Sequence, residues 1–135
     1  MLHFVQMNIE PRQLASPMRS AIDATHVGYF EVGAMVQGLG WERYPYPVSL
    51  ERLLDGNSQT MLMGANPVKR ISPPRQASSS TLFNKTGSTA GFSSYVMFVP
   101  GKKIGLVMLA NKNYPTSERV QTGHAILKQV APMVR

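Results

Sequence analysis

The sequence predicts an α/β (α+β) fold in which an antiparallel sheet is covered by a C-terminal helix. Two apolar runs, 95–99 and 104–110, are separated by the turn residues Pro-Gly-Lys-Lys, a pattern typical of neighbouring antiparallel strands. A helical pattern begins after Pro115, and helical spacing also occurs near the N-terminus. The chain is therefore expected to run from helices through strands to a last helix.

The first 26 residues predict two helices. Apolar residues recur at helical spacing from 2 to 9, and Pro11 ends this first helix. Ser16 is the predicted N-cap of the second helix, with Pro17 at its first position. The expected buried face of the second helix consists of Met18, Ala21, Ile22 and Thr25.

The segment 27–47 is rich in aromatic, β-branched and glycine residues, which predicts one or two short strands joined by turns. The following "SLERLLDG", residues 49–56, predicts a short helix with a capping serine and a terminal glycine. By its composition, "SPPRQASSST", residues 72–81, predicts a loop.

The strands at 95–99 and 104–110 are continuously apolar rather than alternating, so both faces of the sheet are expected to be covered. The last helix supplies part of this cover. Pro115 opens it and Pro132 closes it. Its predicted inner face consists of Val120, Gly123, Leu127 and Val130.

The composition excludes several classes of function. With 135 residues, of which 43% are hydrophobic, the chain suits one domain or a piece of one. It has no cysteine, no apolar run long enough for a membrane, and no signal-peptide pattern at its start. The three histidines show no metal-ligand spacing and are expected to be surface or packing residues. The net charge of +7 is scattered, so we expect no nucleic-acid partner and no membrane partner.

The clearest chemical motif is the triplet Lys85-Thr86-Gly87 at the start of an apolar strand. Lys85 supplies a positive charge, and the Thr86 hydroxyl can donate to a carboxylate. Gly87 allows a ligand to approach the backbone closely. The backbone of Ser88 can offer an N–H to a developing oxyanion and bind an extended substrate. Taken alone, the triplet is a weak signal, and a strand start with a solvated lysine explains it better than a working site does.

The surrounding sequence closely resembles the C-terminal part of class C (AmpC-type) serine β-lactamases. The resemblance rests on "FNKTGSTAGFSSYVMFVPGKKIGLVMLANKNYP", on the following "ERV", and upstream on "VGAMVQGLGWERYPYPVS", "LLDGNS" and "ANPVKRISPP". These motifs occur in the order and spacing of that family and cover essentially the whole chain. The resemblance implies a fold of the serine β-lactamase and penicillin-binding-protein type.

The resemblance also implies roles for particular residues. Lys85 would stabilise negative charge beside the nucleophile, and Thr86 would help to hold the substrate carboxylate. Ser88 would supply its backbone N–H to the oxyanion hole, next to Gly87. Asn113 and Arg119 would lie on the carboxylate-recognition side, since a guanidinium matches carboxylate geometry; without the family, Arg119 fits a surface arginine. No cofactor and no metal is implied.

The family's reaction needs a serine nucleophile in S-x-x-K and a tyrosine in Y-x-N, and neither pattern occurs in this sequence. We therefore expect a single incomplete domain, 1–135, in which 1–26 is the end of a helical region and 27–135 is the C-terminal sheet and helix. Its expected partners are a β-lactam substrate and the missing N-terminal part of the same enzyme. The isolated chain is expected to be inactive.

Two alternatives stay open at this point. The chain can be part of a related penicillin-binding peptidase or esterase of the same fold, or it can be a non-catalytic remnant. The run "LANKNYP" with "ERV" favours the lactamase. The resemblance implies a periplasmic location, although the sequence itself carries no signal peptide.

Overall fold

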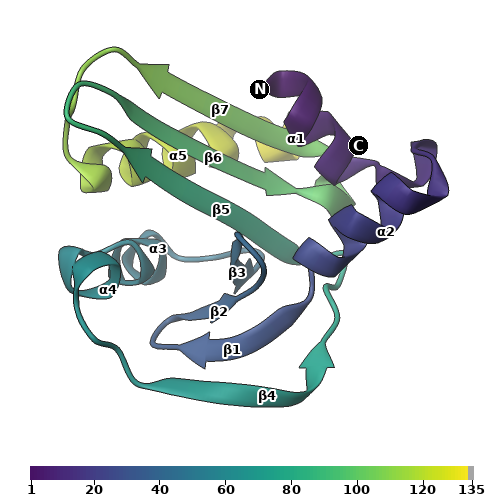
Figure 1. Ribbon diagram of the computed structural model, residues 1–135. Helices are drawn as coiled ribbons and strands as arrows, with labels where there is room; N and C mark the ends of the chain where they lie inside the picture. Colours follow the sequence, from purple (N-terminus) through teal and green to yellow (C-terminus); the bar gives the residue numbers. More distant parts are fainter. Residues whose placement is uncertain (134–135) are drawn as a thin grey trace.

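A computed structural model describes residues 1–133 and shows one seven-stranded antiparallel sheet, in the order β4-β1-β2-β3-β5-β6-β7 (Figure 1). Strands β4 and β7 form its two edges. The strands are β1 (Gly28–Val32), β2 (Met35–Gln37), β3 (Glu42–Pro45), β4 (Val68–Arg75), β5 (Thr81–Ser88), β6 (Ser93–Val99) and β7 (Ile104–Ala110).

Helices lie on both faces of the sheet (Figure 1). They are α1 (Leu2–Ile9), α2 (Ser16–Thr25), α3 (Leu50–Gly56), α4 (Gln59–Met63) and α5 (Thr116–Val130), with short 3-10 turns at Pro11–Gln13, Pro100–Lys102 and Ala131–Met133. No helix within 1–133 combines the length and apolar character that crossing a membrane requires.

The side chains of β6 alternate between two hydrophobic clusters. Tyr95 and Met97 pack with Val120 of α5 on one face. On the other face, Phe98 packs with Phe83 and with Val5 of α1. Both faces of β6 are therefore buried, as the continuous apolar run predicted. The predicted α+β fold with a covering C-terminal helix is confirmed.

The hairpin and the last helix form as the sequence predicts. β7 spans Ile104–Ala110, and Pro115 is the N-cap of α5. Three of the four residues of the predicted inner face are buried, whereas Val130 is 39% exposed. This difference arises because Val130 is the last residue of α5, and Ala131 of the following 3-10 turn reaches the core in its place.

Three predictions for the first half of the chain are wrong in detail, and one helix, α4, was not predicted. Ala15, and not Ser16, is the N-cap of α2, and no side chain caps this helix. Met18 and Ala21 are exposed, because α2 buries only Ile22. The segment 27–47 forms three strands rather than one or two, and α4 follows the predicted helix α3. Weak propensity in short elements leaves tertiary pairing to decide these points.

The predicted loop at 72–81 is partly a strand, because β4 continues to Arg75 and β5 begins at Thr81. The prolines at 73 and 74 are compatible with β4 since it is an edge strand, where missing N–H donors are tolerated. Sequence composition favoured a loop because the sheet edge that accommodates these prolines is a tertiary feature.

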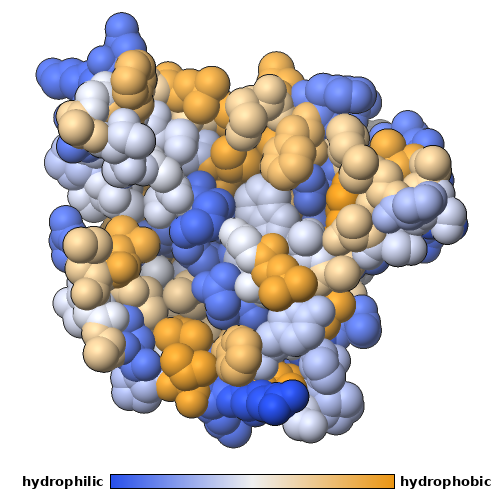
Figure 2. Space-filling view, viewed as in Figure 1, coloured by the Kyte–Doolittle hydropathy of each residue, from blue (hydrophilic) through white to orange (hydrophobic). Residues whose placement is uncertain are grey.

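The sheet keeps exposed apolar residues near β7 and α1. Leu109 of β7 is 66% exposed, and Leu2 and Phe4 of α1 are also exposed. Figure 2 shows apolar side chains gathered over this upper part of the molecule. Such a surface fits a chain that forms part of a larger structure.

His26 is a packing histidine, which is one of the two roles, surface or packing, that the sequence predicted for the histidines. It is 8% exposed, its ring lies 4.4 Å from the ring of Phe83 between centroids, and its Nε2 lies 3.1 Å from Asn8 Oδ1. The Asn8 amide donates to the carbonyl of Phe4, so its oxygen faces the histidine, which must donate from Nε2. Burial is the main cause that lowers the pKa of His26 from 6.5 to about 4.

We expect acid to destabilise the chain through His26. The unfolded state takes up a proton below pH 6.5 and the folded state only near pH 4, so the stabilisation is complete above 6.5 and is lost as the pH falls toward 4. Its full size is about 3 kcal/mol. Urea denaturation between pH 7 and pH 4.5 measures this loss. Over this pH range, a His26→Phe variant is expected to lose less free energy of unfolding than the unmodified chain. The control variant His3→Phe, at an exposed position, is expected to lose as much as the unmodified chain. Equal pH dependence in all three chains would contradict the assignment.

Candidate functional site

The candidate site lies where β5 loses one of its two neighbours. β3 pairs with β5 only as far as Glu42 opposite Asn84. From Lys85 to Ser88, β5 pairs with β6 alone. The residues before this point are buried, and those after it are half-buried or exposed. The Lys85-Thr86-Gly87 triplet is therefore part of a strand with one open edge, and not part of a turn.

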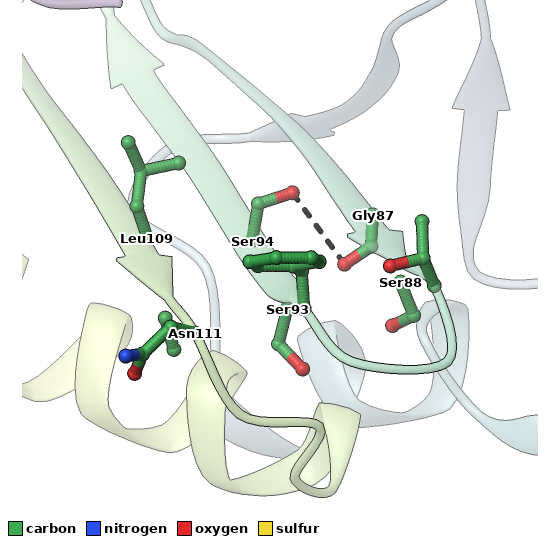
Figure 3. Close-up of a pocket in the computed structure, with 9 residues that line it drawn as sticks. Gly87, Ser88, Ser93, Ser94, Leu109 and Asn111 are labelled. Atoms are coloured by element: carbon green, nitrogen blue, oxygen red, sulfur yellow. Dashed lines mark hydrogen bonds between the residues drawn. The ribbon is translucent and has the colours of Figure 1, made fainter.

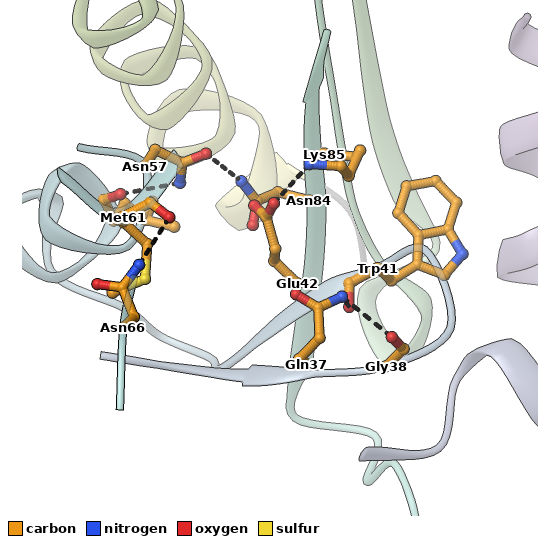
Figure 4. A network of polar contacts seen from close by, with 10 residues as sticks. Gln37, Gly38, Trp41, Glu42, Asn57, Met61, Asn66, Asn84 and Lys85 are labelled. Carbon is orange, nitrogen blue, oxygen red and sulfur yellow. Dashed lines mark hydrogen bonds and ion pairs between the residues drawn. The ribbon is translucent and has the colours of Figure 1, made fainter. Parts of the chain in front are cut away.

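Lys85 is held by a buried carboxylate. Its Nζ lies 2.6 Å from Oε1 of Glu42, and the two side chains are 44% and 4% exposed, respectively. Burial raises the pKa of Glu42 above its usual value, while the positive charge of Lys85 acts in the opposite direction. The ion pair thus fixes the ammonium beside the open edge of β5 (Figure 4), and part of the Lys85 side chain stays exposed.

Two buried asparagines lie next to this ion pair, since Asn84 is the register partner of Glu42 on β5. The Asn84 amide donates to Asn57 Oδ1 at 3.2 Å, and Asn57 donates to the carbonyl of Leu53 in α3 (Figure 4). The hydroxyls of Tyr44 and Tyr95 are buried here without a protein partner, and burial raises the pKa of both. Both tyrosines therefore stay neutral.

Glu42 and Asn84 are site residues that the sequence reasoning missed. A signal for Glu42 was available, since an acidic residue follows Trp41 inside a largely apolar segment. A buried carboxylate needs a cation or several donors. Its partner Lys85 lies more than 40 positions later, and only the pairing of β3 with β5 brings the two together.

Gly87 and Ser88 line one end of a mainly apolar cavity of about 770 Å³ (Figure 3). The cavity crosses the ends of β5, β6 and β7, and its walls include Phe92, Ser94 and Leu109. A Cβ on Gly87 would lie 2.5 Å from Ser94 Oγ, so a side chain at position 87 would displace Ser94. An alanine at this position would therefore require the Ser94 hydroxyl to turn away, and close backbone approach by a ligand stays a prediction.

Asn113 lies in the loop between β7 and α5, next to the end of β6. The Ser93 hydroxyl donates to Asn113 Oδ1 at 3.4 Å, and it accepts from the backbone N–H of Tyr114 at 3.2 Å. Ser93 itself is buried. One hydroxyl thus fastens this loop to the strand that pairs with Gly87 and Ser88.

Arg119 is buried, with 1% exposure, and it joins α5 to the ends of two strands. Its Nη1 donates to the carbonyls of Gly87 and Ser94, both at 2.7 Å. Its Nη2 donates to Ser88 Oγ and Thr116 Oγ1, both at 2.8 Å. The alternative of a solvated surface arginine is therefore wrong. The guanidinium fixes the backbone at Gly87 and Ser88.

The structure thus gathers the predicted site residues at one end of β5. Lys85 to Ser88 follow one another on this strand, Arg119 contacts Gly87 and Ser88, and Asn113 lies beside the adjacent end of β6. Lys85 and Thr86 lie outside the lining of the cavity. The catalytic and substrate-binding roles of all six residues stay predictions. Within 1–133, no group of three or more His, Asp or Glu side chains is placed to hold a metal ion.

The comparisons with known proteins all point to the same family. The model of the family described as Beta-lactamase matches residues 1–131. A β-lactamase from Pseudomonas fluorescens is 52% identical over 127 residues, covering 94% of this chain and 36% of that protein. A β-lactamase from Escherichia coli K12 is 41% identical, covering 94% of this chain and 34% of that protein.

Solved structures agree with this comparison. The D-alanine carboxypeptidase AmpC from Burkholderia cenocepacia is 51% identical, with a TM-score of 0.91, over 95% of this chain and 37% of that one. A class C β-lactamase gives 48% identity and a TM-score of 0.88, over 95% and 35%. The chain therefore spans about a third of the length of its relatives, and the resemblance drawn from its motifs is confirmed. It belongs to the β-lactamase family, as a partial domain of the class C type.

Proposed function

We propose that this chain is the C-terminal part of a serine β-lactamase that hydrolyses penicillins and cephalosporins through an acyl-enzyme. The observation that carries the proposal is the open edge of β5. It begins at Lys85, beside Glu42, the first residue of β3, with which Lys85 forms an ion pair. An extended substrate can pair with such an edge while its reacting carbonyl lies near the ammonium.

In this proposal the nucleophilic serine belongs to the part of the enzyme outside these residues. Its Oγ attacks the lactam carbonyl carbon, the carbon–nitrogen bond of the ring breaks, and water then hydrolyses the resulting ester. Lys85 stabilises negative charge beside the serine, and the Ser88 N–H donates to the oxyanion. Thr86 and Asn113 hold the substrate carboxylate, and Arg119 supports this recognition by fixing Gly87 and Ser88.

A D-alanine carboxypeptidase is the second candidate, because two structural neighbours carry that name. Both reactions acylate a serine with a carbonyl held at a strand edge. Comparing the rates of cephalosporin hydrolysis and of D-alanine release by the completed enzyme separates them. The family also suggests the periplasm as the location, which we retain as part of the proposal.

The isolated chain is expected to show no nitrocefin hydrolysis above the buffer rate, because acyl transfer needs the activated nucleophile that S-x-x-K would supply. Absorbance of the opened ring measures this. Co-expression with the remaining portion of the Pseudomonas fluorescens relative is expected to restore turnover. Turnover by the chain alone that disappears in Lys85→Ala would overturn the assignment of the nucleophile, whereas failure of co-expression to restore any turnover would favour a non-catalytic remnant.

A further inference from the structure

Three arginines line a second cavity, at the opposite end of β5 from Lys85. The cavity, of about 320 Å³, lies among β3, α3 and the segment 76–80 that joins β4 to β5. Its walls contain no carboxylate, and its polar side chains include Arg43, Arg52, Arg75, Ser78, Ser80 and Thr81. An excess of guanidinium groups and hydroxyls in one concave site is the composition that anions require.

Arg43 is the buried member of this group. It is 5% exposed, and its Nη1 and Nη2 donate to the carbonyls of Arg75 and Gln76 at 2.8 and 3.1 Å. Its Nε is buried and has no protein acceptor. A Cβ on Gly28 would lie 2.4 Å from Nη1, so the absence of a side chain at position 28 makes room for the guanidinium.

The positive charge of Arg43 faces neutral groups, which are the carbonyls of Arg75 and Gln76 and the ring of Phe83, 5.9 Å from Cζ to the ring centroid. Within the described part of the chain, no carboxylate lies within 4.0 Å of Arg43 or Arg52. Burial, and then the charge of Arg75, lower the pKa of Arg43 from its ordinary value. A cation that is buried beside a second cation is costly unless a negative charge joins it.

The other two arginines can reach an anion with free donors. Arg52 is exposed, and its Nε donates to the carbonyl of Ala34. This hydrogen bond uses neither Nη1 nor Nη2 of Arg52. Arg75 uses one Nη2 contact with Glu31, and its side chain is 53% exposed. Glu31 also contacts Lys69 at 3.7 Å, so this carboxylate, which lies outside the lining of the cavity, is shared between Arg75 and Lys69.

We propose that this cavity binds a small tetrahedral oxyanion of the phosphate or sulfate class, held by Arg43, Arg52 and Arg75. The oxyanion places negative charge beside the buried guanidinium, and its oxygens accept from the forked donors of the exposed arginines. The site is independent of β-lactam chemistry, because it lies at the start of β5 and contains none of the residues from Lys85 to Ser88.

Equilibrium dialysis of the full chain with radiolabelled inorganic phosphate, at constant ionic strength in chloride, tests the proposal. We expect saturable binding of one phosphate per chain, with displacement by sulfate. Arg52→Gln is expected to weaken binding by about tenfold or more, since it removes charge-assisted hydrogen bonds. Lys102→Gln, which removes the same charge from an exposed position outside the cavity, is expected to bind as the unmodified chain does.

A second variant and a second readout separate binding from folding. Arg75→Gln is expected to weaken phosphate binding as well, while circular dichroism shows a folded chain. Phosphate is also expected to shift the NMR signal of the Arg43 Nε–H group. Absence of saturable binding, an equal loss in Arg52→Gln and Lys102→Gln, or an unshifted Arg43 signal at saturation would each overturn the proposal, because only diffuse attraction to a basic protein would then remain.

Discussion

Replacing Lys85 with alanine in the enzyme completed by its missing portion is expected to lower kcat/KM for nitrocefin by about 10²–10³-fold. The ammonium is the charged group at the open edge of β5, and Glu42 fixes it at 2.6 Å. The substitution removes the positive charge that, in the proposed function, stabilises the transition state, and it leaves Glu42 as a buried carboxyl group without its cation. Steady-state kinetics with nitrocefin measure the change.

Lys102→Ala is the matched control, because this lysine is also exposed but lies at the far end of the β6–β7 hairpin. Its kcat/KM is expected to equal that of the unmodified enzyme. A Lys85→Ala enzyme that keeps full kcat/KM, or one that loses no more than Lys102→Ala, would remove Lys85 from the reaction. The free energy of unfolding of each variant shows whether a loss of activity comes from a loss of structure.

Replacing Arg119 with methionine is expected to lower the free energy of unfolding by about 3–4 kcal/mol. Four acceptors, the carbonyls of Gly87 and Ser94 and the hydroxyls of Ser88 and Thr116, lose their shared donor. A fully buried acceptor without a partner costs about 1–3 kcal/mol, but Gly87, Ser94 and Thr116 are half-buried and Ser88 is exposed, so water replaces part of the lost donors and the total stays below the simple sum. Because domains are stable by only about 5–15 kcal/mol, this single change removes a large part of the total. Urea denaturation measures it.

Two further variants show that this effect belongs to the buried fork. Lys128→Met removes a positive charge from an exposed position on the same helix and is expected to change stability by about 0.5 kcal/mol or less. Arg119→Lys keeps the charge but cannot reach four acceptors, so it is expected to lose most of the same stability. A stable Arg119→Lys chain would show that the charge alone is sufficient.

The elements that the sequence predicted well are those whose apolar pattern is long. The strands at 95–99 and 104–110 and the helix after Pro115 carry continuous or periodic apolar residues, and their burial follows directly from them. The loop expected at 72–81 failed for the opposite reason. Its prolines describe local preference, whereas the strand β4 exists because β1 pairs with it.

The candidate site was predictable where its residues are consecutive and not where they come from distant segments. Lys85 to Ser88 form one motif, so the sequence reveals them together. The partnership of Glu42 with Lys85 depends on the register of β3 against β5. The burial of Arg119 depends on carbonyls more than 20 residues away, and a charged residue in the first turns of a helix gives no sign of it.

The two edges of the sheet differ in what they permit. β4 carries two prolines and the charged residues Lys69, Arg70 and Arg75, which oppose the addition of another strand. β7 has no proline and no charged residue. Self-association by strand addition through β7 would use the more permissive of the two outer strands that the described residues form, so it ends at a closed twofold pair. Open-ended polymers, which require a receptive edge on both sides, are disfavoured by the same asymmetry.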